Sequence, residues 1–145
     1  MTQFVAPAFD PKDLPEQSST GYPEPYKTRV AGRHRRRLGD HAGLANFGVN
    51  LTRLDPGAES SMRHWHTKQD ELIYVLEGEV TLVTDAGRQK LKAGMAAGFP
   101  AGKADGQLDR CLNRRHSASS NQKNPTVPGP ACVPTTAPSV VTSSI

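Results

Sequence analysis

The sequence lacks the features that mark membrane-spanning, secreted and disulfide-stabilised proteins. No apolar run approaches the roughly 20 residues of a membrane span. The N-terminus has no basic start followed by an apolar stretch, and so no visible signal peptide. Cys111 and Cys132 are the two cysteines, too few for a disulfide framework. We therefore expect a cytoplasmic protein with no membrane partner.

Aromatic and acidic residues are both missing from the C-terminal part. No aromatic residue follows Phe99, and no acidic residue follows Asp109. Residues 1–109 contain fourteen Lys/Arg and fourteen Asp/Glu, whereas residues 110–145 contain four basic residues. The net charge of +4 therefore arises after position 109, and it does not mark the folded part as a nucleic-acid-binding domain.

The chain divides by composition into three segments. Residues 1–28 contain five prolines and no apolar period, which predicts an extended arm with one strand near residues 26–30. Residues 29–106 are the expected folded domain. Residues 107–145 are rich in Ser, Pro and Arg, and we expect a disordered tail there, because such a segment buries too little apolar surface.

The folded domain reads as an all-β protein without helices. Short runs separated by Gly-containing turns recur every eight to ten residues, which is typical of an antiparallel sandwich or barrel. In the first run Phe47, Val49 and Leu51 alternate with polar residues and predict one buried face. The expected strands are 46–54, 62–66, 71–76, 80–84, 88–92 and 94–100.

A basic run, GRHRRRLGD at 32–40, precedes these strands. We interpret it as a solvated strand edge, where positive charge discourages unwanted pairing. Contact with phosphate groups is the alternative. A nucleic-acid-binding protein using 33–37 and the basic tail is the corresponding functional hypothesis, but no element that would enter a groove is apparent, so we expect no nucleic-acid partner.

The stretch HWHTKQDE contains candidate metal ligands. Alternate side chains of a strand share a face, so His64 and His66 project together, about 6–7 Å apart at their Cα atoms, with Trp65 on the other face. Glu71 begins the next expected strand. Two imidazoles and one carboxylate suit Fe, Mn, Zn or Ni as a divalent ion. A histidine pair at the surface without a metal is the alternative.

The spacing around these residues resembles the first motif of the cupin superfamily. Gly57, six residues, His64-Trp65-His66, four residues, Glu71, six residues and Gly78 follow one another. The resemblance implies a double-stranded β-helix, a jelly-roll barrel, with a metal inside its mouth. It assigns His64, His66 and Glu71 as ligands, and Asp70 is a weaker candidate.

A second cupin motif usually adds one more histidine. Gly94, Pro100 and Gly102 fit its first half, but Asp105 stands at the histidine position and is a weak oxygen-ligand candidate. Because the pattern ends here, we expect a barrel that is incomplete at its C-terminal end. A reading-frame shift after about residue 106 is one hypothesis for its origin, and a tail specific to this lineage is the other.

An incomplete barrel has an exposed sheet edge, which favours homodimerisation. Residues 139–145 or the N-terminal arm are candidates to cover that edge.

These features lead to several functional expectations. The first is a metal-binding cupin acting on a small polar or anionic metabolite, with dioxygenase-like or isomerase-like chemistry and no catalytic residue assigned. Arg53, Arg63 and Lys103 are candidates to attract an anionic ligand. The alternatives are a non-catalytic cupin that binds a small molecule, and an inactive product of a frameshifted gene. The sequence has no glycine loop of the kind that cradles phosphates, and so no motif that indicates a nucleotide cofactor.

Overall fold

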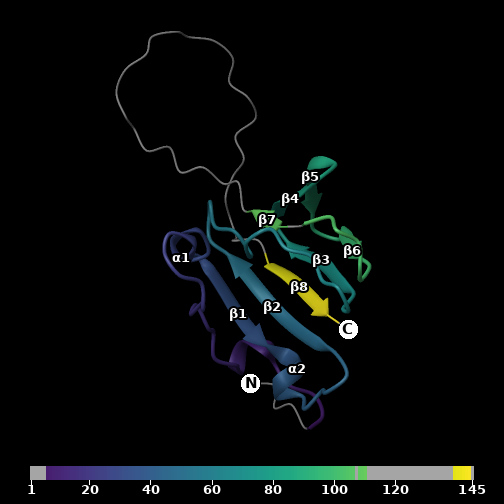
Figure 1. The fold of residues 1–145 in the computed structure, drawn as a ribbon. Coiled ribbons are helices and arrows are strands. Elements are labelled where there is room, and N and C mark those ends of the chain that lie inside the picture. Colours follow the sequence, from purple (N-terminus) through teal and green to yellow (C-terminus); the bar gives the residue numbers. More distant parts are fainter. Residues whose placement is uncertain (1–5, 107, 111–138, 145) are drawn as a thin grey trace, which may run out of the picture.

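The protein folds into two antiparallel sheets (Figure 1). The structure is a computed structural model and describes residues 6–106, 108–110 and 139–144. One sheet has the strand order β1-β2-β8-β3-β6 and the other has the order β5-β4-β7. The predicted all-β jelly-roll class is confirmed. The strands are β1 (Arg33–Arg37), β2 (Gly48–Leu54), β3 (Glu71–Glu77), β4 (Glu79–Thr84), β5 (Gly87–Lys92), β6 (Ala96–Phe99), β7 (Leu108–Arg110) and β8 (Ser139–Ser144).

Three short helical turns depart from the prediction of a helix-free domain. They are the 3-10 turn η1 (Pro11–Asp13) and the α-helices α1 (Tyr26–Arg29) and α2 (Leu38–His41). The predicted strand near residues 26–30 is wrong, because α1 occupies it. Pro25 precedes this helix, and the Thr28 hydroxyl donates to the Glu24 carboxylate at 2.9 Å. Both features favour a turn over an extended strand. None of the described helices is long and apolar enough to cross a membrane.

The predicted strand at 62–66 is also wrong. This stretch belongs to the loop between β2 and β3, and His64 is the one residue of 62–66 that makes a β-bridge. The loop forms local bonds instead, because the ring of His64 bonds to the main-chain oxygen of Met62. Such side-chain bonds to nearby backbone compete with a strand ladder. The two histidines therefore converge from a loop and not from a strand.

Strand β2 is confirmed, but its buried face is the opposite of the predicted one. Thr52 and Leu54 are buried, whereas Val49 and Leu51 are only partly buried and Phe47 is exposed. The inward face thus carries polar residues along most of its length. A strand that lines a polar cavity breaks the rule that the apolar alternation marks the buried side.

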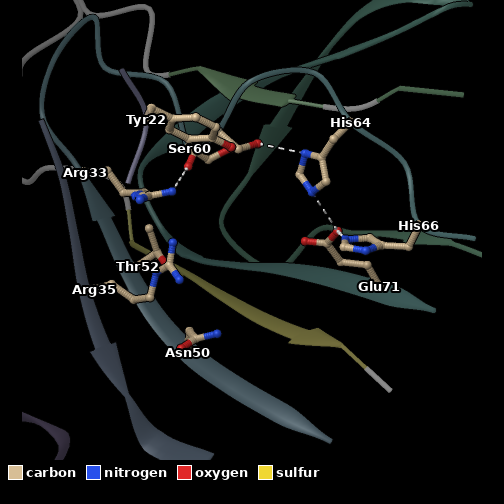
Figure 2. Close-up of a pocket in the computed structure, with 10 residues that line it drawn as sticks. Tyr22, Arg33, Arg35, Asn50, Thr52, Ser60, His64, His66 and Glu71 are labelled. Atoms are coloured by element: carbon tan, nitrogen blue, oxygen red, sulfur yellow. Dashed lines mark hydrogen bonds and ion pairs between the residues drawn. The ribbon is translucent and has the colours of Figure 1, made fainter. Parts of the chain in front are cut away.

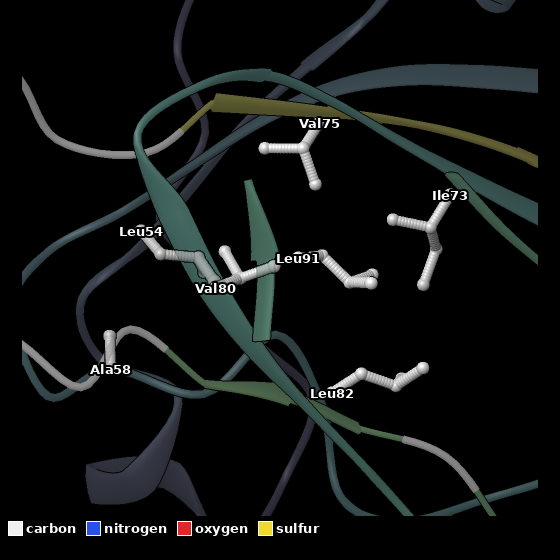
Figure 3. Close-up of a cluster of buried hydrophobic side chains, with 7 residues drawn as sticks. All are labelled: Leu54, Ala58, Ile73, Val75, Val80, Leu82 and Leu91. Atoms are coloured by element: carbon white, nitrogen blue, oxygen red, sulfur yellow. The ribbon is translucent and has the colours of Figure 1, made fainter. Parts of the chain in front are cut away.

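The core draws apolar side chains from both sheets (Figure 3). On β3 the buried residues are Ile73 and Val75, and they lie on the same side of the strand as Glu71. The core is therefore continuous with the site along one face of β3. The buried cluster consists of Leu54, Ala58, Ile73, Val75, Val80, Leu82 and Leu91.

Strand β8 lies inside the larger sheet, between β2 and β3 (Figure 1). It pairs antiparallel with both neighbours, and Val141 stands opposite Leu51 on one side and Tyr74 on the other. The sequence predicted a disordered tail over 107–145 and an incomplete barrel. That prediction is wrong for β7 and β8, while residues 107, 111–138 and 145 lie outside the described part. Of the two candidates for the exposed edge, the C-terminal segment is the one that fills the gap, and it does so in the interior of the sheet.

We expect proline at position 141 to disrupt the larger sheet. Proline has no N–H and is excluded from central strands, so Val141→Pro breaks the pairing between β8 and its neighbours. The expected result is a thermal midpoint lowered by roughly 10 °C or more, since a loss of about 3 kcal/mol shifts a small domain by that much. Circular dichroism melting measures it. Val141→Thr, which keeps the N–H, serves as the control and should melt close to the wild type; equal midpoints for the two variants would contradict the role of β8.

Candidate functional site

His64, His66 and Glu71 meet at one point on the inner side of the larger sheet (Figure 2). Their ligand atoms all lie within 4.8 Å of one another. The His66 Nε2 atom is 3.3 Å from Glu71 Oε2, and the His64 Nε2 atom is 4.0 Å from the same oxygen. The two imidazole rings stand nearly perpendicular, at 85°, with centroids 4.9 Å apart. The three residues that the sequence singled out are therefore brought together.

Local hydrogen bonds fix the tautomer of His64. Its Nδ1 atom lies 2.9 Å from the main-chain oxygen of Met62, and the Ser61 hydroxyl lies 3.3 Å from the same nitrogen. A carbonyl oxygen only accepts, so the Nδ1 atom carries the proton in that bond. The Nε2 atom, which faces Glu71, is then left with a free lone pair. This is the arrangement that histidine ligands of metals usually have.

The turn after β6 supports the loop that carries His66. The Gly102 N–H donates to the main-chain oxygen of His66 at 2.9 Å, and the Ala101 N–H donates to Asp70 Oδ1 at 2.7 Å. Gly102 has a φ of +77°, a conformation that residues with a Cβ rarely adopt. Gly102, the last residue of the Gly94, Pro100 and Gly102 pattern, thus braces the histidine loop together with Ala101.

Neither acidic alternative joins the three-residue cluster. Asp70 binds the Ala101 N–H, as stated, and Asp105 Oδ1 accepts from the main-chain N–H of Asp85 at 2.7 Å. Asp105 therefore holds the turn between β4 and β5 instead of supplying a ligand. In the part of the chain that the structure describes, the group of potential ligands consists of His64, His66 and Glu71 alone.

The cluster opens onto a cavity of about 230 Å³. One side of this cavity comes from β1 and β2, and Figure 2 shows Arg33 and Arg35 there, across from Glu71. The lining residues are Tyr22, Arg33, Arg35, Asn50, Thr52, Ser60, Ser61, His64, His66 and Glu71. The group of His64, His66 and Glu71 and two guanidinium groups therefore share one polar cavity.

The two arginines are the residues that sequence reasoning missed. The basic run forms edge strand β1, as predicted, but it is not simply solvated. Alternation along β1 sends Arg33 and Arg35 to the cavity, while His34 and Arg36 face the N-terminal arm. The period-2 spacing of Arg33 and Arg35 indicates that both lie on one face of the strand. Only the facing strand shows that this face lines the cavity.

Burial lowers the pKa of both arginines below the ordinary value for the residue. For Arg35 the second cause is the neighbouring charge of Arg37, and the carboxylate of Glu71 acts in the opposite direction. Arg33 donates from Nη1 to the main-chain oxygen of Ser60 at 2.7 Å. Guanidinium groups stay charged in proteins, so two partly desolvated cations line the cavity.

The three basic residues expected near the mouth lie elsewhere. Arg53 pairs with Glu16 and Asp55 on the arm side of β2. Arg63 binds the main-chain oxygen of Gly106 and pairs with Asp85.

Lys103 lines a second cavity of about 440 Å³ together with Trp65 and His66. His66 thus lies between the two cavities, and among these three basic residues only Lys103 is near it.

The N-terminal arm is fixed to the outer face of β1 and β2. Ser18 bonds to Nδ1 of His34 at 2.7 Å, and the Arg36 Nε–H donates to the main-chain oxygen of Leu14 at 3.0 Å. Gln17 and Arg35 exchange two backbone hydrogen bonds. The arm then continues to Tyr22, which lines the cavity. Docking of the arm therefore helps to close the site.

Two carboxylates in this contact have lowered pKa values. The hydrogen bond from Arg53 lowers the pKa of Glu16, and the hydrogen bond from His34 lowers that of Asp55. A carboxylate with a depressed folded-state pKa contributes stability above its unfolded value. That contribution is lost as the pH falls through the folded value.

We expect Glu16→Gln to lower the thermal midpoint at pH 7 and to have a smaller effect as the pH falls through the lowered pKa of Glu16. As the wild-type carboxylate becomes protonated, its contribution is lost too. Melting curves between pH 3 and 7 measure the gap between wild type and variant. Glu77→Gln is the control, at an exposed carboxylate. A gap for Glu16→Gln that stays constant with pH would contradict the assignment.

The fold is similar to that of known proteins. The family model for the cupin domain matches residues 50–104. A sugar phosphate isomerase from a cupin superfamily, from Silicibacter pomeroyi, is 32% identical to this chain with a TM-score of 0.77; the match covers 95% of this chain and 74% of that one. The chain belongs to the cupin superfamily.

More distant structures share the fold alone. The polyketide cyclase RemF from Streptomyces resistomycificus is 19% identical, with a TM-score of 0.61, and the match covers 99% of this chain and 78% of that one. An RmlC-like cupin from Shewanella frigidimarina is 17% identical, with a TM-score of 0.57 and coverage of 99% and 92%. No curated protein matches the chain. These relatives confirm the cupin fold that the histidine spacing predicted.

Proposed function

We propose that this cupin binds one divalent metal ion through His64, His66 and Glu71 and acts as an isomerase on a small sugar-like metabolite. The observation that carries the proposal is the convergence of these three side chains on a polar cavity. The relative from Silicibacter pomeroyi, described as a sugar phosphate isomerase, supports the reaction class.

The donor set fits a metal ion. Ligand atoms lie about 2.0–2.2 Å from such ions, which places two adjacent ligand atoms roughly 3 Å apart. The separation between His66 Nε2 and Glu71 Oε2 is 3.3 Å, and that between His64 Nε2 and the same oxygen is 4.0 Å. All three ligand atoms lie within 4.8 Å of one another. Imidazole with carboxylate suits Fe, Mn, Zn or Ni.

When bound, the ion supplies Lewis-acid polarisation of a substrate oxygen. The chain's own residues orient the substrate and limit its size. Tyr22 closes one side of the cavity, and Asn50 and Thr52 offer amide and hydroxyl groups suited to hydroxyl-rich ligands. A cavity of about 230 Å³ favours a small metabolite over a drug-sized or polymeric ligand.

Metal content tests the site. The wild-type protein, purified, stripped with chelator and titrated with Mn²⁺ or Zn²⁺, is expected to bind about one ion. His66→Ala and Glu71→Gln should each weaken binding by tenfold or more, since even supporting residues around a metal change affinity by about 10–100-fold. Titration calorimetry gives the affinities. His41→Ala changes a histidine outside the cluster and should bind metal as the wild type does. Equal metal content in all four proteins would refute the metal site at His64, His66 and Glu71.

A non-catalytic binding protein is the second candidate. It is favoured by Asp105, which stands at the family's fourth-ligand position but bonds to Asp85. The two functions differ in their dependence on metal. Stabilisation by ribose 5-phosphate that persists in chelator, with no conversion of the sugar in the metal-loaded protein, supports the binding protein. Conversion that disappears in His66→Ala supports the isomerase.

A further inference from the structure

We propose that Arg33 and Arg35 form an anion subsite that takes the phosphate group of the ligand, on the opposite side of the cavity from His64, His66 and Glu71. This inference rests on the proposed function, which identifies the rest of the ligand as a small sugar-like metabolite. It adds a binding role for two residues of an edge strand that otherwise resembles a solvated basic run.

The Arg35 side chain lines the cavity, where the charge of Glu71 acts on it, but in the described residues its guanidinium makes no hydrogen bond or ion pair. Arg36 and Arg37, its neighbours on the same strand, each pair with a carboxylate, Glu16 and Asp40 respectively. Arg35 thus differs from Arg36, which faces the arm, and from Arg37, which shares the face of Arg35 but is exposed and paired.

Burial of an unpaired charge is unfavourable, and this makes the cavity attractive to anions. Desolvation is the largest cause of the lowered pKa of both Arg33 and Arg35. A bound anion offsets that cost by supplying the missing acceptor. Water alone compensates less well in a confined polar cavity than a charged acceptor does.

The balance of charge also favours an anion. Glu71 is the one carboxylate among the described lining residues, against two guanidinium groups. Under the proposed function a metal ion at Glu71 neutralises that carboxylate further. The cavity then carries a net positive charge, and a ligand with a negative group facing β1 is the complementary one.

The arrangement of donors suits a phosphate monoester. Arg33 and Arg35 are two residues apart on one strand, so their Cα atoms lie about 6–7 Å apart on the same face. Arg33 is oriented by its bond to the Ser60 main-chain oxygen, and each guanidinium has five N–H donors. Two planar forks from one strand match the three oxygens and roughly two negative charges of a phosphate.

The test uses inorganic phosphate as the probe, titrated by calorimetry into metal-free full-length protein. We expect Arg35→Gln to weaken phosphate binding by about tenfold or more, because hydrogen bonds to charged groups contribute about 1.5–3 kcal/mol. Arg88→Gln is the control; it removes the same charge from an exposed position of β5 that does not line the cavity, and it should bind within about twofold of the wild type. Equal losses of phosphate affinity in both variants would show that phosphate responds only to general surface charge, and would overturn the subsite.

A second variant keeps the test decisive if Arg35→Gln fails to fold. Arg35→Lys keeps the charge and removes the fork, and it is expected to bind phosphate more weakly than the wild type. Phosphate binding by Arg35→Lys equal to that of the wild type, or no phosphate binding by the wild type at millimolar concentration, overturns the proposal. So does acetate binding with the same dependence on Arg35 as phosphate. Ribose 5-phosphate is expected to bind and ribose to bind much more weakly.

The two proposals fail in different ways. Phosphate binding that depends on Arg35 in a protein that binds no Mn²⁺ supports the subsite and refutes the metal-dependent function. If Mn²⁺ binding depends on His66 but phosphate affinity does not depend on Arg35, the subsite alone is refuted. Metal affinity of Arg35→Gln, measured in parallel, should not fall below that of the wild type, because Arg35 is not among the ligand group and its charge repels a cation.

Discussion

The site depends on the backbone pairing of β8 with both β2 and β3. Strands β1 and β2 bring the two arginines, and β3 brings Glu71, yet these strands are joined in the larger sheet only through β8. The ladder on each side of β8 sets how far apart the two walls of the cavity stand. A segment with the composition of a disordered tail therefore decides the geometry of the site.

Strand alternation then gives β1 two separate roles. One face of β1 presents Arg33 and Arg35 to the cavity, and the other presents His34 and Arg36 to the N-terminal arm. The arm in turn supplies Tyr22 to the cavity. The same five residues thus hold the arm in place and line the site, because successive side chains of a strand point to opposite faces. The pleat of β1 therefore sends the side chains of this uniformly basic run to two opposite faces.

The cavity combines groups that would repel one another without a ligand. Two guanidinium groups share the cavity with Glu71, and the metal that we propose at His64, His66 and Glu71 adds further positive charge. An anionic ligand between the two walls relieves this repulsion. The metal cluster and the anion subsite are therefore complementary parts of one proposed site, and each is testable by itself. The cytoplasmic location and the homodimer stay predictions.

The sequence by itself determined the all-β class, the strands β2 to β6 and the group of His64, His66 and Glu71 as candidate ligands. Strong local signals were present for these: period-2 alternation, glycine turns, and the spacing from His64 to Glu71. Tertiary structure alone decided the inward face of β2, the place of β8 and the position of Arg35 in the cavity. The physical reason is that a strand's buried side and a side chain's ligand are set by what lies across from it, through pairings between segments more than 80 residues apart, such as Leu51 with Val141.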